Sequence, residues 1–291
     1  MRFPRHYRNI RQAVLGILLS TLLLPGLQPG SAHAFSDDLE IWQGDFEEML
    51  ERRQIRMLVV YNQLLYFLDG ATQRGTSVDA AKLLEDFLNE KYALKTRKLS
   101  VILIPVTREE LLPALMEGVG DIAAANLTIT PDRQEQVDFS DPFTTGVSEV
   151  IVTGPTAPDL GSLADLAGQS IHVRKSSSYF SSLQHVNAQL KENQLAPIEV
   201  IEAEEYLEDS DLLEMVNAGL LPIAVVDDHK ARFWADVFDH ITVREDLVLT
   251  TGGSIAWAFR KQSPTLEKII NQFVKENKKG TLHGNMILNR Y

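Results

Sequence analysis

The segment that decides the fold runs from Gly120 to Arg133 and reads GDIAAANLTITPDR. Its first part, Asp121 to Ala125, is a short run of mostly small apolar residues, which is typical of a buried strand. The sequence then reaches Thr130-Pro131, which predicts a helix start with threonine as the N-cap and proline in the first helical position. The segment therefore predicts a strand, a short loop and a helix in direct succession.

Strand and helix patterns alternate before this segment. The β-rich runs 55–61 and 101–105 predict strands. Helices are predicted over 78–91, where apolar residues recur every three to four positions, and over 108–117, which ends before two glycines. This alternation implies parallel βαβ units with right-handed crossovers. Two flanking segments are predicted to be an acidic surface helix, at residues 36–51, and a polar loop, at residues 69–75.

The same alternation starts again after a stretch of linker composition, Thr153 to Pro158. Strands are predicted over 147–152, 170–173, 199–201 and 223–226, and helices over 163–168, 179–191 and 212–219. A β-rich run over 247–259 and a helix over 264–278 complete the chain. The pattern predicts an α/β fold with two lobes and a ligand cleft between them, because small ligands favour such clefts.

The N-terminus has the pattern of an export signal. Its first eleven residues contain four arginines and no acid, an apolar run follows from Ala13 to Leu24, and Ala32-His33-Ala34 provides a cleavage site. An uncleaved anchor is the alternative, but the run is shorter than the roughly 20 residues that span a bilayer. We expect a signal peptide over 1–34, a lead-in helix over 35–53, lobe 1 over 54–152 and 248–291, and lobe 2 over 153–247. This organisation predicts a periplasmic protein.

Composition excludes several classes of function. The 291 residues include no cysteine, which excludes disulfides, thiol nucleophiles and a lipidated cysteine anchor. A net charge of −12 argues against binding to nucleic acid, whose phosphates require a basic surface. The sequence contains no zinc motif and no nucleotide-binding glycine motif. We therefore expect neither a metal nor a cofactor.

The end of the deciding segment carries polar side chains that suit an anion. Asn126 and Thr128 lie two residues apart at the end of the predicted strand, so their side chains are expected to leave on one side. Arg133 lies in the first turn of the following helix and offers a planar fork that matches a carboxylate. The pattern predicts a carboxylate receptor, and the alternative is a strand cap followed by a surface arginine.

The run from Thr128 to Arg133, followed by Val137 to Phe143, resembles the signature of the family 3 extracellular solute-binding proteins. These are the two-lobed, amino-acid-type receptors of bacterial uptake systems. The likeness continues through Gly168 to Ser178 and Ala224 to Asp228, and covers roughly residues 54 to 285. It implies the type II periplasmic binding protein fold.

The resemblance implies roles for residues of lobe 1. The residue that matches Arg133 clamps the ligand α-carboxylate with help from a hydroxyl at Thr128, and Asn126 stands where a backbone carbonyl or serine contacts the ligand. The sequence departs from the family at Tyr66-Phe67, where Pro-Phe is usual. Tyr66 or Phe67 is a candidate to stack on the ligand, with Tyr66 preferred for the site and a place in the core as the alternative for either. This departure leaves the ligand open.

The resemblance also implies ligand contacts from lobe 2. Residues that match Ser177 and Ser178 provide backbone or hydroxyl donors to the carboxylate, and the alternative is that these serines only cap a helix. Asp227 stands where the family has an acid for the ligand α-ammonium. Its neighbour Asp228 is the alternative, because only one of the two can face the ligand. An arginine in one lobe and an acid in the other would suit a zwitterion.

The second half has a narrower resemblance. The segments 221–229, 256–261 and 278–285 are similar to the solute-binding module of the membrane-bound lytic murein transglycosylase F family. In that family the module precedes a domain that cleaves peptidoglycan, and no residue of this chain matches its catalytic glutamate. The acidic run from Glu202 to Asp211 predicts a solvated surface and not a pair of catalytic carboxylates.

These observations predict a periplasmic solute-binding protein that is not an enzyme. It is expected to close its lobes around an amino acid, a small peptide or a peptidoglycan-derived fragment, for transport or sensing. Its expected partners are the small-molecule ligand and either an inner-membrane ABC permease or a peptidoglycan-cleaving domain, and we expect a monomer. The alternatives are the regulatory binding part of a lytic transglycosylase and a sensory module with a degenerate pocket.

Overall fold

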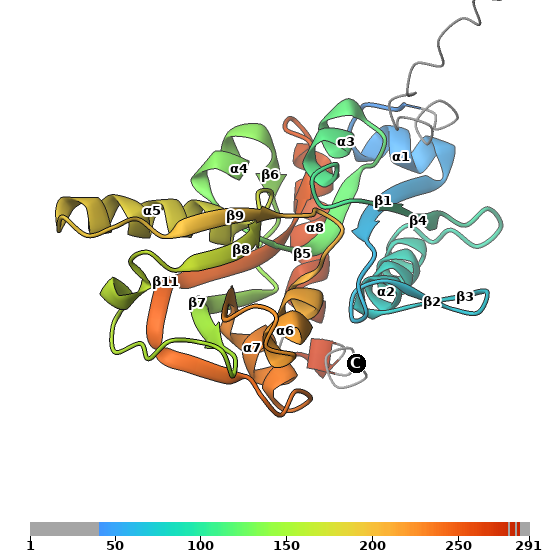
Figure 1. Cartoon of the computed structure of the whole chain (residues 1–291). Coiled ribbons are helices and arrows are strands. Elements are labelled where there is room, and N and C mark those ends of the chain that lie inside the picture. The colour runs from blue at the N-terminus through green and yellow to red at the C-terminus, as the bar shows by residue number, and fades with distance from the viewer. Residues whose placement is uncertain (1–40, 279, 283, 286–291) are drawn as a thin grey trace, which may run out of the picture. The chain divides into compact units, whose positions relative to one another are not determined.

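The computed structural model describes residues 41–278, 280–282 and 284–285 (Figure 1), so the predicted signal peptide lies outside the described residues. The helices are α1 (Phe46–Arg52), α2 (Thr76–Lys91), α3 (Leu111–Glu117), α4 (Pro131–Gln136), α5 (Ser178–Glu192), α6 (Asp209–Asn217), α7 (Asp228–Ala235) and α8 (Pro264–Asn277), with one 3-10 helix, η1 (Leu163–Leu166). The strands are β1 (Gln54–Val60), β2 (Phe67–Asp69), β3 (Thr72–Arg74), β4 (Ser100–Val106), β5 (Ile122–Thr128), β6 (Asp138–Phe139), β7 (Thr144–Thr153), β8 (Ser170–Arg174), β9 (Glu199–Ala203), β10 (Ile223–Asp227) and β11 (Thr242–Phe259).

Lobe 1 contains α1 to α4, β1 to β6, α8 and the C-terminal part of β11. Along its whole length β1 pairs in parallel with β4, and it also pairs in parallel with β5. The helices α2 and α3 connect these strands, which confirms the predicted βαβ units. One hydrophobic cluster, with Leu84 and Phe273, lies under α2 and α8, and a second, with Leu115, lies under α3. Apolar residues repeated along each helix therefore fix the helices on the sheet.

Lobe 2 contains η1, β8 to β10, α5 to α7, and most of β7 with the N-terminal part of β11. The strands β8 and β9 pair in parallel, and β10 pairs antiparallel with β7. A separate hydrophobic cluster fills this lobe, with Leu183 on α5, Leu213 on α6 and Trp234 on α7. Each lobe thus has a core of its own.

The strand β11 belongs to both lobes. Its residues from Thr242 onward pair antiparallel with β7, and its last residues, from Ile255 to Phe259, pair antiparallel with β5. The sheet therefore continues from lobe 2 into lobe 1 in the order β10-β7-β11-β5-β1-β4. The hydrogen-bond ladder between β11 and β7 is irregular near Gly252, which adopts a φ of 76°. At the next residue, Gly253, a Cβ atom would lie 3.1 Å from the Val147 carbonyl oxygen. Glycine fits both requirements of this bend.

Two local predictions are wrong, and one helix was missed. The helix predicted over 36–51 starts only at Phe46 among the described residues, because Gly44 adopts a φ of 120° and the Asp45 carboxylate caps the helix by accepting from the Phe46 N–H at 2.7 Å. The loop predicted over 69–75 contains most of the hairpin β2–β3, whose turn is formed by Gly70 and Ala71. The helix α7 is not predicted by the sequence pattern.

Candidate functional site

A cavity of about 300 Å³, including its opening, is lined by residues of both lobes. Most lining residues come from the ends of strands β5, β8 and β10 and from the segments that follow them, while Arg108 lies between β4 and α3 and Asp209 begins α6. The full lining is Arg108, Asn126, Leu127, Thr128, Arg133, Arg174, Ser176, Ser177, Ser178, Tyr179, Asp209, Asp227 and Lys230. Six of the seven binding residues expected from the sequence are among them. The exception is Tyr66, which is buried in the lobe 1 core. The ligand contacts of all seven stay predictions.

The end of β5 and the start of α4 position the lobe 1 side of the cavity. Asn126 has a φ of 56°, a left-handed conformation that side chains rarely adopt and that often marks functional sites. Thr130 is the N-cap of α4, with its hydroxyl accepting from the Arg133 N–H at 3.4 Å, which confirms the predicted helix start. The cap fixes the first turn of α4 and with it the base of the Arg133 side chain.

The Arg133 guanidinium contacts both lobes. Nη1 donates to the Thr128 carbonyl oxygen at 2.7 Å, and Nη2 donates to the Ser176 carbonyl oxygen of lobe 2 at 2.9 Å. Both acceptors are uncharged, and no carboxylate in the described part of the chain forms an ion pair with Arg133. Burial, together with the positive charge of Arg108, lowers the pKa of Arg133 to about 10. A largely desolvated guanidinium without an acid partner would be stabilised by a ligand carboxylate.

The two serines of lobe 2 have acceptors for their hydroxyls. Ser177 Oγ donates to the Arg174 carbonyl oxygen at 2.9 Å, and Ser178 Oγ donates to Glu149 Oε1 at 2.7 Å. The N–H groups of the first turn of α5 have no partner within the helix. Both serine hydroxyls thus already have acceptors within the protein, whereas N–H groups of this turn remain available as donors.

Asp227 ends β10, is 1% exposed and faces a lysine. Its Oδ2 lies 2.8 Å from Lys230 Nζ, and its Oδ1 is buried without a hydrogen-bond partner. The Tyr179 hydroxyl accepts from the Asp227 N–H and from Lys230 Nζ, each at 3.1 Å. The neighbouring Asp228 lies outside the cavity lining and pairs with Arg232 at 2.9 Å.

Glu149 is a second buried acid, next to Asp227. It lies opposite Asp227 in the antiparallel pair of β7 and β10, and it is 5% exposed. Burial, and to a lesser degree the charge of Asp227, raises the pKa of Glu149. Its Oε1 accepts from Ser178, its Oε2 has no hydrogen-bond partner, and the residue is not among those that line the cavity.

Buried ion pairs complete the wall of the cavity. Asp209 accepts from Arg174 Nη2 at 2.5 Å and from Lys230 Nζ at 2.7 Å, and against the effect of burial these cations lower the pKa of Asp209 well below its usual range. Glu208 pairs with Arg108 across the lobes. The solvated surface predicted for residues 202–211 is therefore wrong for Glu208 and Asp209, because each has cationic partners elsewhere in the fold.

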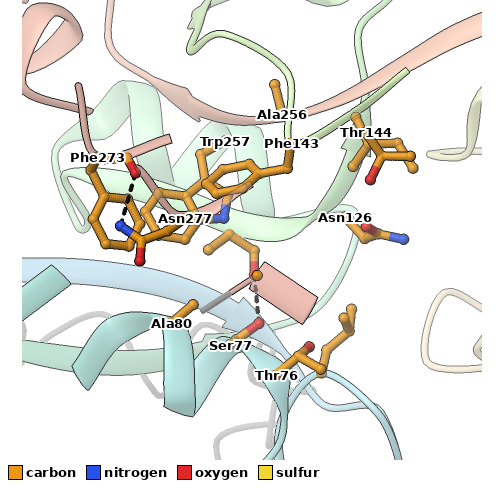
Figure 2. A pocket seen from close by; sticks show the side chains of 14 residues that line it. Thr76, Ser77, Ala80, Asn126, Phe143, Thr144, Ala256, Trp257, Phe273 and Asn277 are labelled. Carbon is orange, nitrogen blue, oxygen red and sulfur yellow. Dashed lines mark hydrogen bonds between the residues drawn. The ribbon is translucent and has the colours of Figure 1, made fainter. Parts of the chain in front are cut away.

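A second pocket, of about 740 Å³ including its opening, lies in lobe 1 beside the cavity (Figure 2). Three aromatic rings form one wall: Trp257 lies 4.8 Å from Phe143 and 5.5 Å from Phe273, between ring centroids. Ala80 of α2 lines the opposite part, and Asn126 lines both this pocket and the cavity. Its mostly apolar lining suits an uncharged group.

The most important residue that the sequence analysis missed is Lys230. It stands three residues after Asp227, on the first turn of α7. This i, i+3 spacing of acid and lysine would have indicated the pair if α7 had been predicted. No comparable signal exists for Arg108, whose acid partner lies 100 residues away.

No group of three or more histidines, aspartates or glutamates in the described part is arranged to hold a metal ion. Among helices built from described residues, none is long and apolar enough to cross a membrane.

Comparison with known proteins identifies the class. The chain belongs to the bacterial extracellular solute-binding proteins, family 3, and the model of that family matches residues 61–286. Its fold is that of the type II periplasmic binding proteins. An ancestral arginine-binding protein bound to arginine is 24% identical, with a TM-score of 0.65 over 82% of this chain and 98% of that one. An amino acid ABC transporter substrate-binding protein from Streptococcus pneumoniae, bound to L-arginine, is 17% identical, with a TM-score of 0.67 over 85% and 97%.

Curated relatives are longer proteins. The chain is 28% identical over 245 residues to membrane-bound lytic murein transglycosylase F of Desulfosudis oleivorans, which covers 82% of this chain and 48% of that protein. The chain thus spans about half of the length of the curated relatives it matches. The similarity to these relatives agrees with the narrower resemblance found in the sequence.

Proposed function

We propose that this chain is a non-enzymatic binding module that captures a small carboxylate-bearing solute between its lobes, in the bacterial cell envelope. The observation that carries the proposal is Arg133, whose guanidinium lines the cavity, donates to carbonyl oxygens of both lobes and has no acid partner among the described residues. A ligand carboxylate would supply the missing negative charge and would touch both lobes. Such a ligand stabilises the closed arrangement, because it binds that arrangement better than an open one.

The proposed solute is an amino acid, a small peptide or a peptidoglycan-derived fragment. The structural neighbours with bound arginine support a ligand of amino-acid size. We propose that Thr128, Asn126 and the backbone of Ser177 and Ser178 contact the ligand near its carboxylate. The apolar pocket beside Asn126 would accept an uncharged group of the same ligand.

The proposed organisation follows the sequence analysis. Residues 1–34 are an export signal and 35–53 a lead-in segment, followed by lobe 1 over 54–152 and 248–291 and lobe 2 over 153–247. We propose a periplasmic monomer that delivers its solute to an inner-membrane permease or reports it to a sensor.

A second candidate is the regulatory binding part of a lytic transglycosylase. The observation that favours it is the name shared by the curated relatives, together with the half of their length that this chain spans. In that case the chain alone would not clear a suspension of peptidoglycan, and muropeptides would be prominent among its ligands.

The test is a thermal-shift screen of amino acids, dipeptides and muropeptides, followed by calorimetry. We expect Arg133→Ala to weaken the best carboxylate ligand by about 100-fold or more, because removing one partner of a buried charge pair costs several kcal/mol. Arg232→Ala is the matched control, since Arg232 forms only surface ion pairs with Asp228 and Glu245. Unchanged affinity in Arg133→Ala would refute the proposal.

A further inference from the structure

The cavity already contains a cation beside Asp227, the residue to which the family resemblance assigns a ligand ammonium group. Lys230 Nζ lies 2.8 Å from Asp227 Oδ2 and 2.7 Å from Asp209 Oδ2. The lysine side chain is 16% exposed, and the two carboxylates are nearly buried. The negative charge of Asp227 is therefore compensated within the protein.

A ligand ammonium at Asp227 would be repelled by this lysine. Both cations would lie within a few ångströms of one another in a poorly hydrated cavity, where like charges repel strongly. Asp209 offers no alternative, because Arg174 also pairs with it at 2.5 Å. The site that is expected from the sequence to accept an ammonium is thus occupied by a charge of the same sign.

Asp227 nevertheless has one acceptor position left. Its Oδ1 is buried, has no hydrogen-bond partner and belongs to a residue that lines the cavity. A neutral amide N–H offers one donor and no charge, so it would satisfy this oxygen without repulsion from Lys230.

The other charged residues of the cavity also favour a ligand with a carboxylate and an uncharged nitrogen. Arg108 is paired with Glu208 and Arg174 with Asp209, so Arg133 is the one lining cation in the described chain without an acid partner. Buried Glu149 contacts Ser178 and is not part of the lining. Among the described residues, the cavity therefore has one cation without an acid partner and one acceptor without a donor, which an anion and a neutral N–H group would match.

We propose that Lys230 determines specificity by selecting carboxylates whose neighbouring nitrogen is an amide, and by rejecting those whose nitrogen is a free ammonium. N-acylated amino acids and the C-termini of peptides share this chemistry. The inference rests on the proposed function, because it takes Arg133 as the carboxylate site.

The experiment compares matched ligands by calorimetry on the whole chain. The probes are L-leucine with N-acetyl-L-leucine, L-arginine with N-acetyl-L-arginine, and the dipeptide L-alanyl-L-leucine. We expect the acylated member of a pair to bind at least tenfold more tightly than the free amino acid. Tight binding of the dipeptide, compared with N-acetyl-L-leucine, would identify a peptide C-terminus as the source of the preferred group.

Variants of Lys230 test the cause of the preference. Lys230→Met leaves the charge of Asp227 without its cation. We expect it to reduce the ratio of the affinity for the acylated ligand to that for the free amino acid by tenfold or more. Lys230→Arg keeps the cation and should keep the preference for the acylated ligand. Lys175→Met, at an exposed lysine next to the serine loop, is the control and should leave the ratio unchanged. If Lys230→Met does not fold, the affinity ratios of the wild type and of Lys230→Arg still test whether acylated ligands are preferred.

The possible failures are distinguishable. Equal or tighter binding of free amino acids to the wild type, lost in Arg133→Ala, would overturn this inference and leave the proposed function intact. A ratio that does not change in folded Lys230→Met would overturn the role of Lys230. No binding of any probe carboxylate, nor of any ligand in the screen of amino acids, dipeptides and muropeptides, would overturn the proposed function, and this inference with it.

Discussion

Arg108 of lobe 1 and Glu208 of lobe 2 form a two-point ion pair in which Nε and Nη2 each lie 2.8 Å from a carboxylate oxygen. The same carboxylate accepts from Asn62 Nδ2 of lobe 1 at 3.0 Å. Arg108 is anchored in turn to β5, since its Nη1 donates to the Ala125 carbonyl oxygen at 2.7 Å. The two side chains are 11% and 6% exposed. This pair joins the lobes at the wall of the cavity.

Breaking this pair should weaken the closed arrangement. Glu208→Ala leaves the Arg108 charge buried without its partner, which costs about 3–5 kcal/mol in comparable pairs. We expect a larger radius of gyration by small-angle scattering without ligand, and weaker ligand binding. Glu202→Ala, at an exposed glutamate, is the control.

Glu208 also precedes α6, so the loss of a helix cap has to be separated from the loss of the ion pair. A double-mutant cycle with Arg108→Ala does this, and we expect a coupling energy of about 1–3 kcal/mol in urea unfolding. Additive effects of the two substitutions, with unchanged scattering, would show that the pair does not hold the lobes together.

Filling the apolar pocket should change ligand preference by size. Ala80 lines the pocket, so Ala80→Leu places a larger apolar side chain there. We expect about tenfold weaker binding of N-acetyl-L-leucine, with N-acetyl-L-alanine little affected. The control is Ala188→Leu on the exposed face of α5. An equal loss for both ligands in calorimetry would show that the pocket does not receive the ligand side chain.

A third prediction concerns stability against pH. The fully buried Asp121 carboxylate accepts from Arg56 Nη2 at 2.8 Å and from Arg260 Nη2 at 3.2 Å, and it also pairs with Arg52. Burial acts to raise the pKa of Asp121, but hydrogen bonds and charge from the arginines, chiefly Arg56, lower it. The stabilisation is therefore complete above the unfolded pKa of about 4 and is lost as the pH falls below it.

Asp121→Asn should accordingly lower the free energy of unfolding by about 3–5 kcal/mol at neutral pH. The difference from the wild type should shrink as the pH falls from about 4 towards 2. Urea titrations at several pH values measure this difference. Asp69→Asn, at an exposed pair with Arg74, should have a much smaller effect at every pH. A difference that is independent of pH would refute the assignment to ionised Asp121.

Signals confined to a few neighbouring residues predicted the local structure well. Thr130 caps α4 through a contact to a residue three positions away, so the cap is visible in the sequence. The βαβ order is visible because each strand and helix has its own apolar period. The hairpin β2–β3 was missed because each strand is only three residues long, and β3 is polar and exposed, so neither strand shows an apolar alternation.

The charge pattern of the site could not be predicted in the same way. An acidic run predicts a solvated surface, yet Glu208 and Asp209 are buried because Arg108 and Arg174 reach them from 100 and 35 residues away. Likewise, the sequence indicates that Asp227 faces the ligand, but not that Lys230 neutralises it. Such pairs depend on how the lobes and helices pack, and a local sequence pattern does not predict that packing.

The shared strand β11 has a consequence for how the chain melts. Leu247 of β11 is part of the lobe 2 core, while Trp257 and Phe259 of the same strand are part of the lobe 1 core. Unfolding of either core would remove the packing of one part of β11. It would also expose an unpaired strand edge in the sheet of the other lobe. The two cores are therefore coupled through one element, and heat should melt them in a single cooperative transition rather than one after the other.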